Sequence, residues 1–261
     1  MQASDSREVP ALAGTVGRYC EATPRPELQA HFQCVWASAL PAGHAGAVAV
    51  VPDGCVDLLW RDGRLLAVGP DITAARPDLA PGATVLGARF QPGAAPHWLG
   101  LPLSDIVGCE VDLADLWGRR AHEFAGRMAE AGKQRAEVFQ NQLANLAPRV
   151  ATPSREAAAI FSLVQANAGT AGETMPLLLR RLGLSERTLR RRSIEHFGYG
   201  AKTLERILRF QHALTLARAS AYGGLAALAA DAGYADQAHL SREIQSLCGM
   251  TATALLRQLR V

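Results

Sequence analysis

Residues 233–243 read GYADQAHLSRE and join two stretches whose apolar residues have helical spacing, 225–232 and 236–247. Gly233 can end the first helix, because glycine readily adopts the left-handed conformation that closes helices. Asp236 can cap the second helix with its side-chain oxygen. We therefore predict helices over 225–232 and 236–247, followed by Gly249 and a last helix from Thr251. Two helices joined by a short turn that contains glycine form a helix-turn-helix unit.

The same plan occurs about fifty residues earlier in the chain. A predicted helix over 175–182 ends at Gly183, and Ser185 caps a helix that runs to Phe197 and ends at Gly198. Between the two units, residues 202–219 form one long predicted helix of roughly 27 Å at ~1.5 Å per residue. Adjacent major-groove segments on one face of DNA lie ~34 Å apart. This helix could place the two units in adjacent grooves; the alternative is a structural role in the core, and both can be true.

The second helix of each unit presents side chains that can read DNA. Guanidinium groups pair with guanine or phosphate oxygens, and Gln can read adenine. The alternatives are a solvated charged surface for the arginines and a cap or packing role for His239. Lys202 begins the long helix, where a cation is expected to meet phosphate. The predicted DNA-binding residues are Arg187, Arg190, Arg191, Lys202, Gln237, His239, Ser241 and Arg242.

Charge is distributed unevenly between the two parts of the chain. The formal net charge is +3, but residues 174–261 hold thirteen Lys and Arg against six Asp and Glu, while residues 1–173 hold fourteen against eighteen. A basic C-terminal part fits a nucleic-acid reader beside a separate sensory module, whereas chance or a solvated helix surface would give the same counts. With no signal peptide and no long apolar run, we expect a soluble, cytoplasmic protein.

The first half alternates short apolar strands with turn signals, which predicts a small β-barrel or sandwich-like domain followed by helices. The expected strands are 31–38, 47–51, 55–60, 65–68 and 84–90, the third and fourth forming a hairpin. The expected helices are 94–99, 104–107, 113–131 and 135–146. Residues 145–154 contain Pro148 and Pro153 and form a predicted linker before the helix 155–168. The fold class is therefore α+β, with an N-terminal sensory or dimerisation domain over 1–150 and an all-α DNA-binding domain over 151–261.

A sensor pocket needs an apolar lining with a few placed polar groups. Residues of this kind among the strands are Asp53, Cys55, Asp57, Arg89, His97 and Trp98. A turn at 52–54 and a core role for Cys55 are the plainer alternatives. Acidic neighbours raise the pKa of Cys55, which disfavours a nucleophile. We expect no catalytic residues and no cofactor.

The five cysteines at positions 20, 34, 55, 109 and 248 are scattered along the chain. An odd number without C-x-x-C pairs predicts free thiols and no structural metal. Cys34, Cys55, His31 and His97 could together supply metal ligands, but they are not paired at short spacing in the sequence.

Several motifs carry a family resemblance in the C-terminal part: LSERTL (184–189), HFG (196–198), ILRF (207–210) and, above all, GYADQAHLSRE (233–243). The stretch 174–259 resembles the AraC-type DNA-binding domain. The front half resembles the sensory domain of one branch of these regulators, on the motifs VPDGCVDL (51–58), GARFQPG (87–93), LGLPL (99–103) and DLWG (115–118). The chain departs from the family pattern at Ser193, where a core aromatic is usual, and at Ala201 and Ala252, where proline is common.

The resemblance implies a two-domain transcription regulator that binds promoter DNA. It assigns groove reading to two sets of side chains. They are Arg187, Arg190 and Arg191 in the first unit, and Gln237, His239, Ser241 and Arg242 in the second. A small-molecule effector, RNA polymerase and a second copy of the chain are the other expected partners. Two alternatives stay open: an enzyme or repair protein with a catalytic N-terminal domain, and a constitutive DNA-binding protein whose front domain only dimerises.

Overall fold

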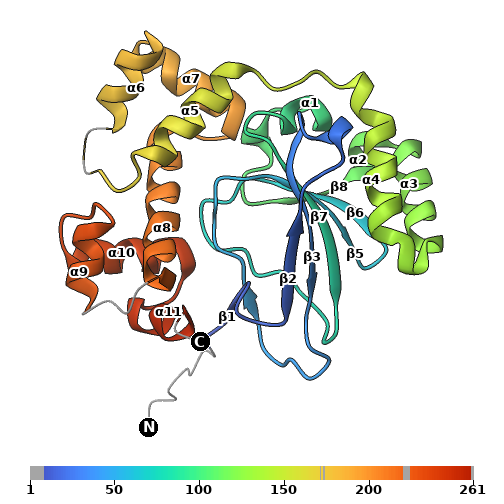
Figure 1. Ribbon diagram of the computed structural model, residues 1–261, viewed down its shortest axis with the longest axis horizontal. Coiled ribbons are helices and arrows are strands. Elements are labelled where there is room, and N and C mark those ends of the chain that lie inside the picture. Colours follow the sequence, from blue (N-terminus) through green and yellow to red (C-terminus); the bar gives the residue numbers. More distant parts are fainter. Residues whose placement is uncertain (1–8, 171, 173, 220–223, 260–261) are drawn as a thin grey trace.

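A computed structural model describes residues 9–170, 172, 174–219 and 224–259 (Figure 1). Its N-terminal domain is built on an antiparallel six-stranded sheet of order β2-β3-β7-β5-β6-β8. The strands in that order are β2 (Arg18–Ala22), β3 (Phe32–Ala39), β7 (Thr84–Phe90), β5 (Asp57–Arg61), β6 (Arg64–Val68) and β8 (Glu110–Asp112). A separate parallel pair consists of β1 (Ala11–Leu12) and β4 (Val48–Ala49).

The predicted α+β class is confirmed, with an N-terminal sheet domain and a C-terminal helical domain, but over the described residues the sheet stays open and forms no closed barrel. Within the described residues, its edge strands β2 and β8 each pair with one neighbour only. Closure requires both edges to pair with each other, but β8 spans three residues and β2 is exposed along its whole length. Helices cover the sheet instead of a second sheet. Leu58 and Trp60 face a core shared with the helices, while Leu59 between them faces the opposite side, as the strand period of two requires.

The predicted hairpin is confirmed. Strands β5 and β6 pair in register around Asp62 and Gly63, and both turn residues have positive φ angles, 51° and 78°. Two consecutive positive φ values define the tight turn whose twist matches that of paired strands, and Asp-Gly is one of its preferred sequences.

The helices that cover the sheet are α1 (Ala95–Leu99), α2 (Leu113–Trp117), α3 (Arg119–Glu130) and α4 (Arg135–Leu146). The single helix expected over 113–131 is broken at Gly118, whose φ of 56° lies outside the helical range. The helix expected over 104–107 is a short 3-10 turn, Leu103–Asp105. The sequence did not predict β1, β2 or β8, because these strands are short or exposed and lack an apolar alternation.

The C-terminal domain consists of helices α5 (Arg155–Ala166), α6 (Thr174–Leu182), α7 (Glu186–Phe197), α8 (Ala201–Ala219), α9 (Leu225–Asp231), α10 (Gln237–Cys248) and α11 (Ala252–Leu259). The predicted caps are confirmed: the side chain of Ser185 accepts the amide of Thr188, and that of Asp236 accepts the amide of His239. Gly198 and Gly249 close α7 and α10 with left-handed backbones. Two helix-turn-helix units therefore flank the long helix α8, as the sequence predicts.

The two domains share part of one core. Leu12 and Ala49, both fully buried, pack with the C-terminal helices. Polar contacts join the N-terminal domain to the long helix and to the last helix: Pro52 O accepts from Gln211 Nε2 of α8 at 2.7 Å, and Leu12 N donates to Gln258 Oε1 of α11 at 2.6 Å. The boundary at residue 150 remains a prediction, because N-terminal residues complete the packing of the C-terminal domain. None of the described helices is both long and apolar enough to cross a membrane.

Candidate nucleic-acid interface and ligand cleft

Helix α7 buries one face and exposes the face predicted to read DNA. Leu189, Ser193 and Phe197 are buried at a spacing of four residues, which keeps them on one side of the helix. Arg187, Arg190 and Arg191 are all exposed, as the predicted reading face requires. None of the three forms an ion pair within the part of the chain that the structure describes. Their guanidinium groups are thus available to an external partner.

The fourth arginine of this helix has a different role. Arg192 lies 3.2 Å from Glu156 of α5 and 3.2 Å from Glu195 of its own helix. Glu156 also lies 3.5 Å from His196 Nε2. Arg192 therefore holds α7 against α5. Ser193, at the position where the resemblance noted in the sequence implies an aromatic residue, is fully buried, and its hydroxyl has no hydrogen-bond partner among the described residues.

Helix α10 shows the same division into two faces. Leu240, Ile244 and Leu247 are buried, while Gln237 and Arg242 are exposed. Ser241 and His239 are half-buried. The imidazole of His239 packs edge-on against the ring of Tyr234, with 5.2 Å between ring centroids. The packing role considered for His239 is thus what its ring does here, and base reading by this residue remains a prediction.

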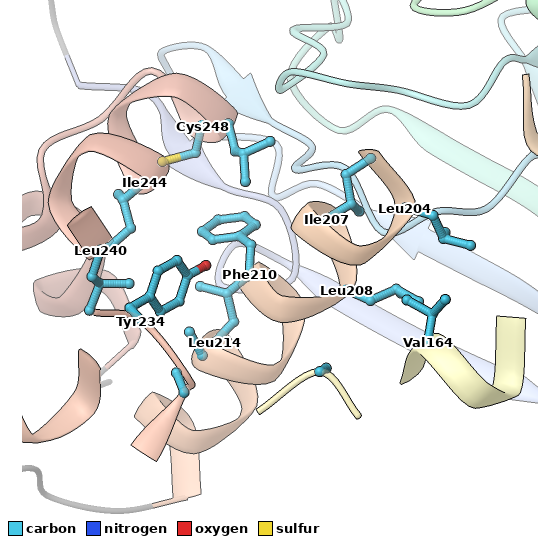
Figure 2. Packing of buried hydrophobic residues seen from close by; sticks show 14 of the residues in the cluster. Val164, Leu204, Ile207, Leu208, Phe210, Leu214, Tyr234, Leu240, Ile244 and Cys248 are labelled. Carbon is cyan, nitrogen blue, oxygen red and sulfur yellow. The ribbon is translucent and has the colours of Figure 1, made fainter. Parts of the chain in front are cut away.

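Helix α8 holds the two units together through its core side chains and one polar link. Figure 2 shows Phe210 and Leu214 of α8 directed toward Tyr234, Leu240 and Ile244 of the second unit. On the surface, Arg206 donates to Glu243 of α10 at 2.6 Å and to Ser246 at 2.6 Å. Sequence reasoning missed this link, because its partners lie 37 and 40 residues apart.

Four of the predicted ligand residues meet in one polar cluster of the N-terminal domain. Arg89 on β7 lies 3.0 Å from Asp53 Oδ2 and 3.4 Å from Asp57 Oδ1. Asp57 also accepts from the indole of Trp36 at 3.0 Å. Asp53 accepts the amide of Cys55 at 2.9 Å, which fixes the turn before β5. A further carboxylate that sequence reasoning missed, Glu21 on β2, lies 3.8 Å from Arg89.

Burial and mutual repulsion perturb the titratable groups of this cluster. Burial would lower the pKa of Arg89, but Asp57 and Asp53 raise it well above its usual range, so the guanidinium stays charged. Burial and then Asp53 raise the pKa of the Cys55 thiol well above its usual value. Burial and then Asp53 also raise the pKa of nearby Asp71 to about 7. A thiol held protonated in this way is a poor nucleophile.

The cluster opens onto a cleft of about 500 Å³ between the two domains. The strands and loops of the N-terminal domain form one wall, and helices α5 and α8 form the other. The residues that line it are Gln33, Asp53, Cys55, Arg89, Gln91, Pro92, Ala158, Phe161, Ser162, Gln165, Leu208, Gln211 and Thr215. Sequence reasoning named no residue of the helical wall, because that wall is distant in the chain from the strands and loops that it faces.

Two predicted ligand residues lie elsewhere. Trp98 is buried in the core under the sheet, 4.9 Å from Phe32 and 5.4 Å from His31 between ring centroids. His97 is exposed on α1, in a separate groove beside His196. Over the described ranges, no three His, Cys, Asp or Glu side chains are grouped as metal ligands would be.

The cysteines differ in exposure, and we expect this to be measurable. Cys20 and Cys109 are exposed, Cys55 is half-buried, and Cys34 and Cys248 are buried. Burial raises the pKa of Cys34 to about 11. Titration of the native protein with an aromatic disulfide reagent should therefore show two fast thiols and a slow third. Denaturation without reductant should release all five. A total near one thiol, or five equally fast thiols, would contradict this.

Comparisons with known proteins give two matches by sequence family. Residues 178–258 match the model described as a helix-turn-helix domain, and residues 20–112 match a domain of unknown function (DUF6597). No curated protein matches the chain.

Among solved structures, similar chains come from ToxT of Vibrio cholerae. The apo form of a ToxT variant is 12% identical, with a TM-score of 0.44, over 93% of this chain and 96% of that one. Another ToxT structure is 12% identical, with a TM-score of 0.46, over 81% of this chain and 93% of that one. ToxT bound to an unsaturated fatty acid is 12% identical, with a TM-score of 0.41, over 78% and 83% of the respective chains.

Proposed function

This chain carries an AraC-type helix-turn-helix domain and is a DNA-binding transcription regulator, and on that premise we propose how it reads DNA and responds to a ligand. Helices α7 and α10 enter adjacent major-groove segments of one duplex. The observation that carries this proposal is the pair of capped helices, each with a buried apolar face and an exposed polar face. Helix α8 joins them as a single packed unit.

The cleft between the domains is the proposed effector site. One of its walls includes Leu208, Gln211 and Thr215 of α8, the helix that sets the spacing of the two units. A solute in the cleft would touch this helix, the turn that carries Asp53 and the strand that carries Arg89. A ligand shifts a conformational equilibrium only when it contacts the two states differently, and a site on the joint between domains meets that condition.

The remaining parts of the proposal concern partners and location. RNA polymerase and a second copy of the chain are its proposed protein partners, and the cytoplasm, where promoter DNA lies, is its proposed location. We propose no catalytic step for the N-terminal domain. The raised pKa of Cys55 supports this against a cysteine-dependent enzyme.

The test of the proposed function is salt-dependent binding of the full chain to duplex promoter DNA, including the region upstream of its own gene. The full chain is used because Leu12 and Ala49 complete the core of the helical domain. About four phosphate contacts would lower the affinity roughly a hundredfold between 50 and 200 mM salt. A folded protein with no salt-dependent binding to any such duplex would refute the proposal.

Lys202 offers a test of phosphate contact alone. It is exposed at the start of α8 and forms no ion pair that the structure describes. Lys202→Gln should weaken binding to every DNA sequence alike and reduce the slope of log affinity against log salt by about one. Lys133, the only other lysine of the chain, is exposed between α3 and α4, and Lys133→Gln should change neither. Equal slopes for the two variants would place Lys202 away from the DNA.

A further inference from the structure

The guanidinium in the cleft is already neutralised. Its Nη2, Nε and Nη1 atoms lie 3.0, 3.4 and 3.8 Å from the carboxylates of Asp53, Asp57 and Glu21, respectively. Three carboxylates against one guanidinium give the cluster a formal charge of −2. Even if Asp57 holds a proton, the cluster keeps an excess negative charge. Burial raises the pKa of nearby Asp71 to about 7, and the charge of Asp53 adds to the rise.

This arrangement excludes one class of ligand and favours another. A carboxylate in the cleft would find every nitrogen of Arg89 facing a carboxylate of the protein, and no other Lys or Arg lines the cleft among the described residues. The rest of the lining offers amides and hydroxyls, including Gln165, Gln211 and Ser162. It also offers the ring of Phe161, which is 7% exposed and lines the cleft. Aromatic faces attract cations through their ring quadrupole.

We propose that the cleft selects a small organic cation, a protonated amine or related group with an apolar body, and rejects carboxylates. The charged group lies toward Asp53, where the excess negative charge of the cluster is reached from the cleft, and the apolar body lies against Phe161 and Leu208. This inference names the chemical class of the effector and rests on the proposed function only for its consequence on DNA.

Cys55 lines the same cleft, and the reactivity of its thiol reports on the charge selectivity of the cleft. The experiment uses the full chain with Cys20→Ser and Cys109→Ser, which removes the two exposed thiols. Two methanethiosulfonate reagents of similar size are compared, one with a trimethylammonium group and one with a sulfonate. Each transfers its thioalkyl group to the thiolate and releases methanesulfinate. The rate ratio does not depend on the fraction of thiolate, so the raised pKa of Cys55 slows both reagents equally. Peptide mapping by mass spectrometry confirms the site.

The reference is the same cation-to-anion rate ratio measured with 2-mercaptoethanol in water. At Cys55 the ratio should exceed the reference by about tenfold or more at low salt. The charged group of each reagent comes close to the Asp53 carboxylate, and charges in such proximity interact appreciably even in a high dielectric. Asp53→Asn should reduce the excess. A ratio at or below the reference, or no reaction with either reagent, would overturn the proposal.

The adducts then separate this inference from the proposed function. The cationic adduct keeps an ammonium group in the cleft, and its affinity for promoter DNA is compared with that of the unmodified protein. A high rate ratio with unchanged DNA affinity supports the cation-selective cleft and refutes effector control through it. A reference-like ratio with altered DNA affinity refutes cation selectivity and leaves effector control standing.

Discussion

Replacing Phe210 with alanine should lower the free energy of unfolding by about 3–5 kcal/mol, the usual cost of truncating a fully buried aromatic side chain. Phe210 lies at 0% exposure in the middle of α8. Its ring packs toward Tyr234, Leu240 and Ile244 of the second unit (Figure 2). The loss combines the transfer of the ring to water with a cavity that helices on both sides cannot close. Urea unfolding followed by circular dichroism measures it.

The matched control is Phe210→Leu, which keeps most of the apolar volume and should cost less than half as much. Where Phe210→Ala remains folded, its DNA affinity should also fall, because the ring of Phe210 helps to fix α10 against α8. A loss of unfolding free energy below about 1 kcal/mol for Phe210→Ala would contradict this prediction. It would show that the core relaxes around the cavity or that the ring of Phe210 does not pack between α8 and the second unit.

Replacing Arg190 or Arg242 with alanine should each weaken binding to the preferred DNA site by about 1–3 kcal/mol, or roughly five- to 150-fold. Each variant should also relax base preference at its own position. Arg190 lies on α7 and Arg242 on α10, both exposed, and the two helices are proposed to enter separate grooves. The relaxed positions should therefore fall in two clusters about 10 base pairs apart. Selection from randomised duplexes with each variant measures this.

Arg119→Ala is the control for a general loss of charge, because Arg119 is an exposed arginine on α3 of the other domain. It should alter neither affinity nor preference. One shared cluster of relaxed positions, or unchanged preference in both α7 and α10 variants, would mean that the reading face has been assigned wrongly even if the protein binds DNA.

The sequence by itself determined the features that depend on neighbouring residues. Ser185 and Asp236 each accept an amide three residues ahead, and Gly198 and Gly249 close the same helices. The Asp62-Gly63 turn likewise determined its hairpin. These interactions lie within a few residues, so the amino-acid order alone specifies them. The exposure of Arg190 and Arg242 followed from helical period for the same reason.

The tertiary structure alone decided which distant groups meet. Glu21 joins Asp53 and Asp57 around Arg89 because β2, β3, β7 and β5 are neighbours in the sheet, and the sequence carries no sign of that strand order. The helical wall of the cleft belongs to helices that come well after the strands and loops that it faces. The sequence predicts Trp98 as a pocket residue because it is an aromatic side chain near apolar strands. In the structure it is buried in the core, where apolar side chains surround it. Long-range packing sets both the charge of the cleft and its place on α8, since neither depends on residues adjacent in the chain.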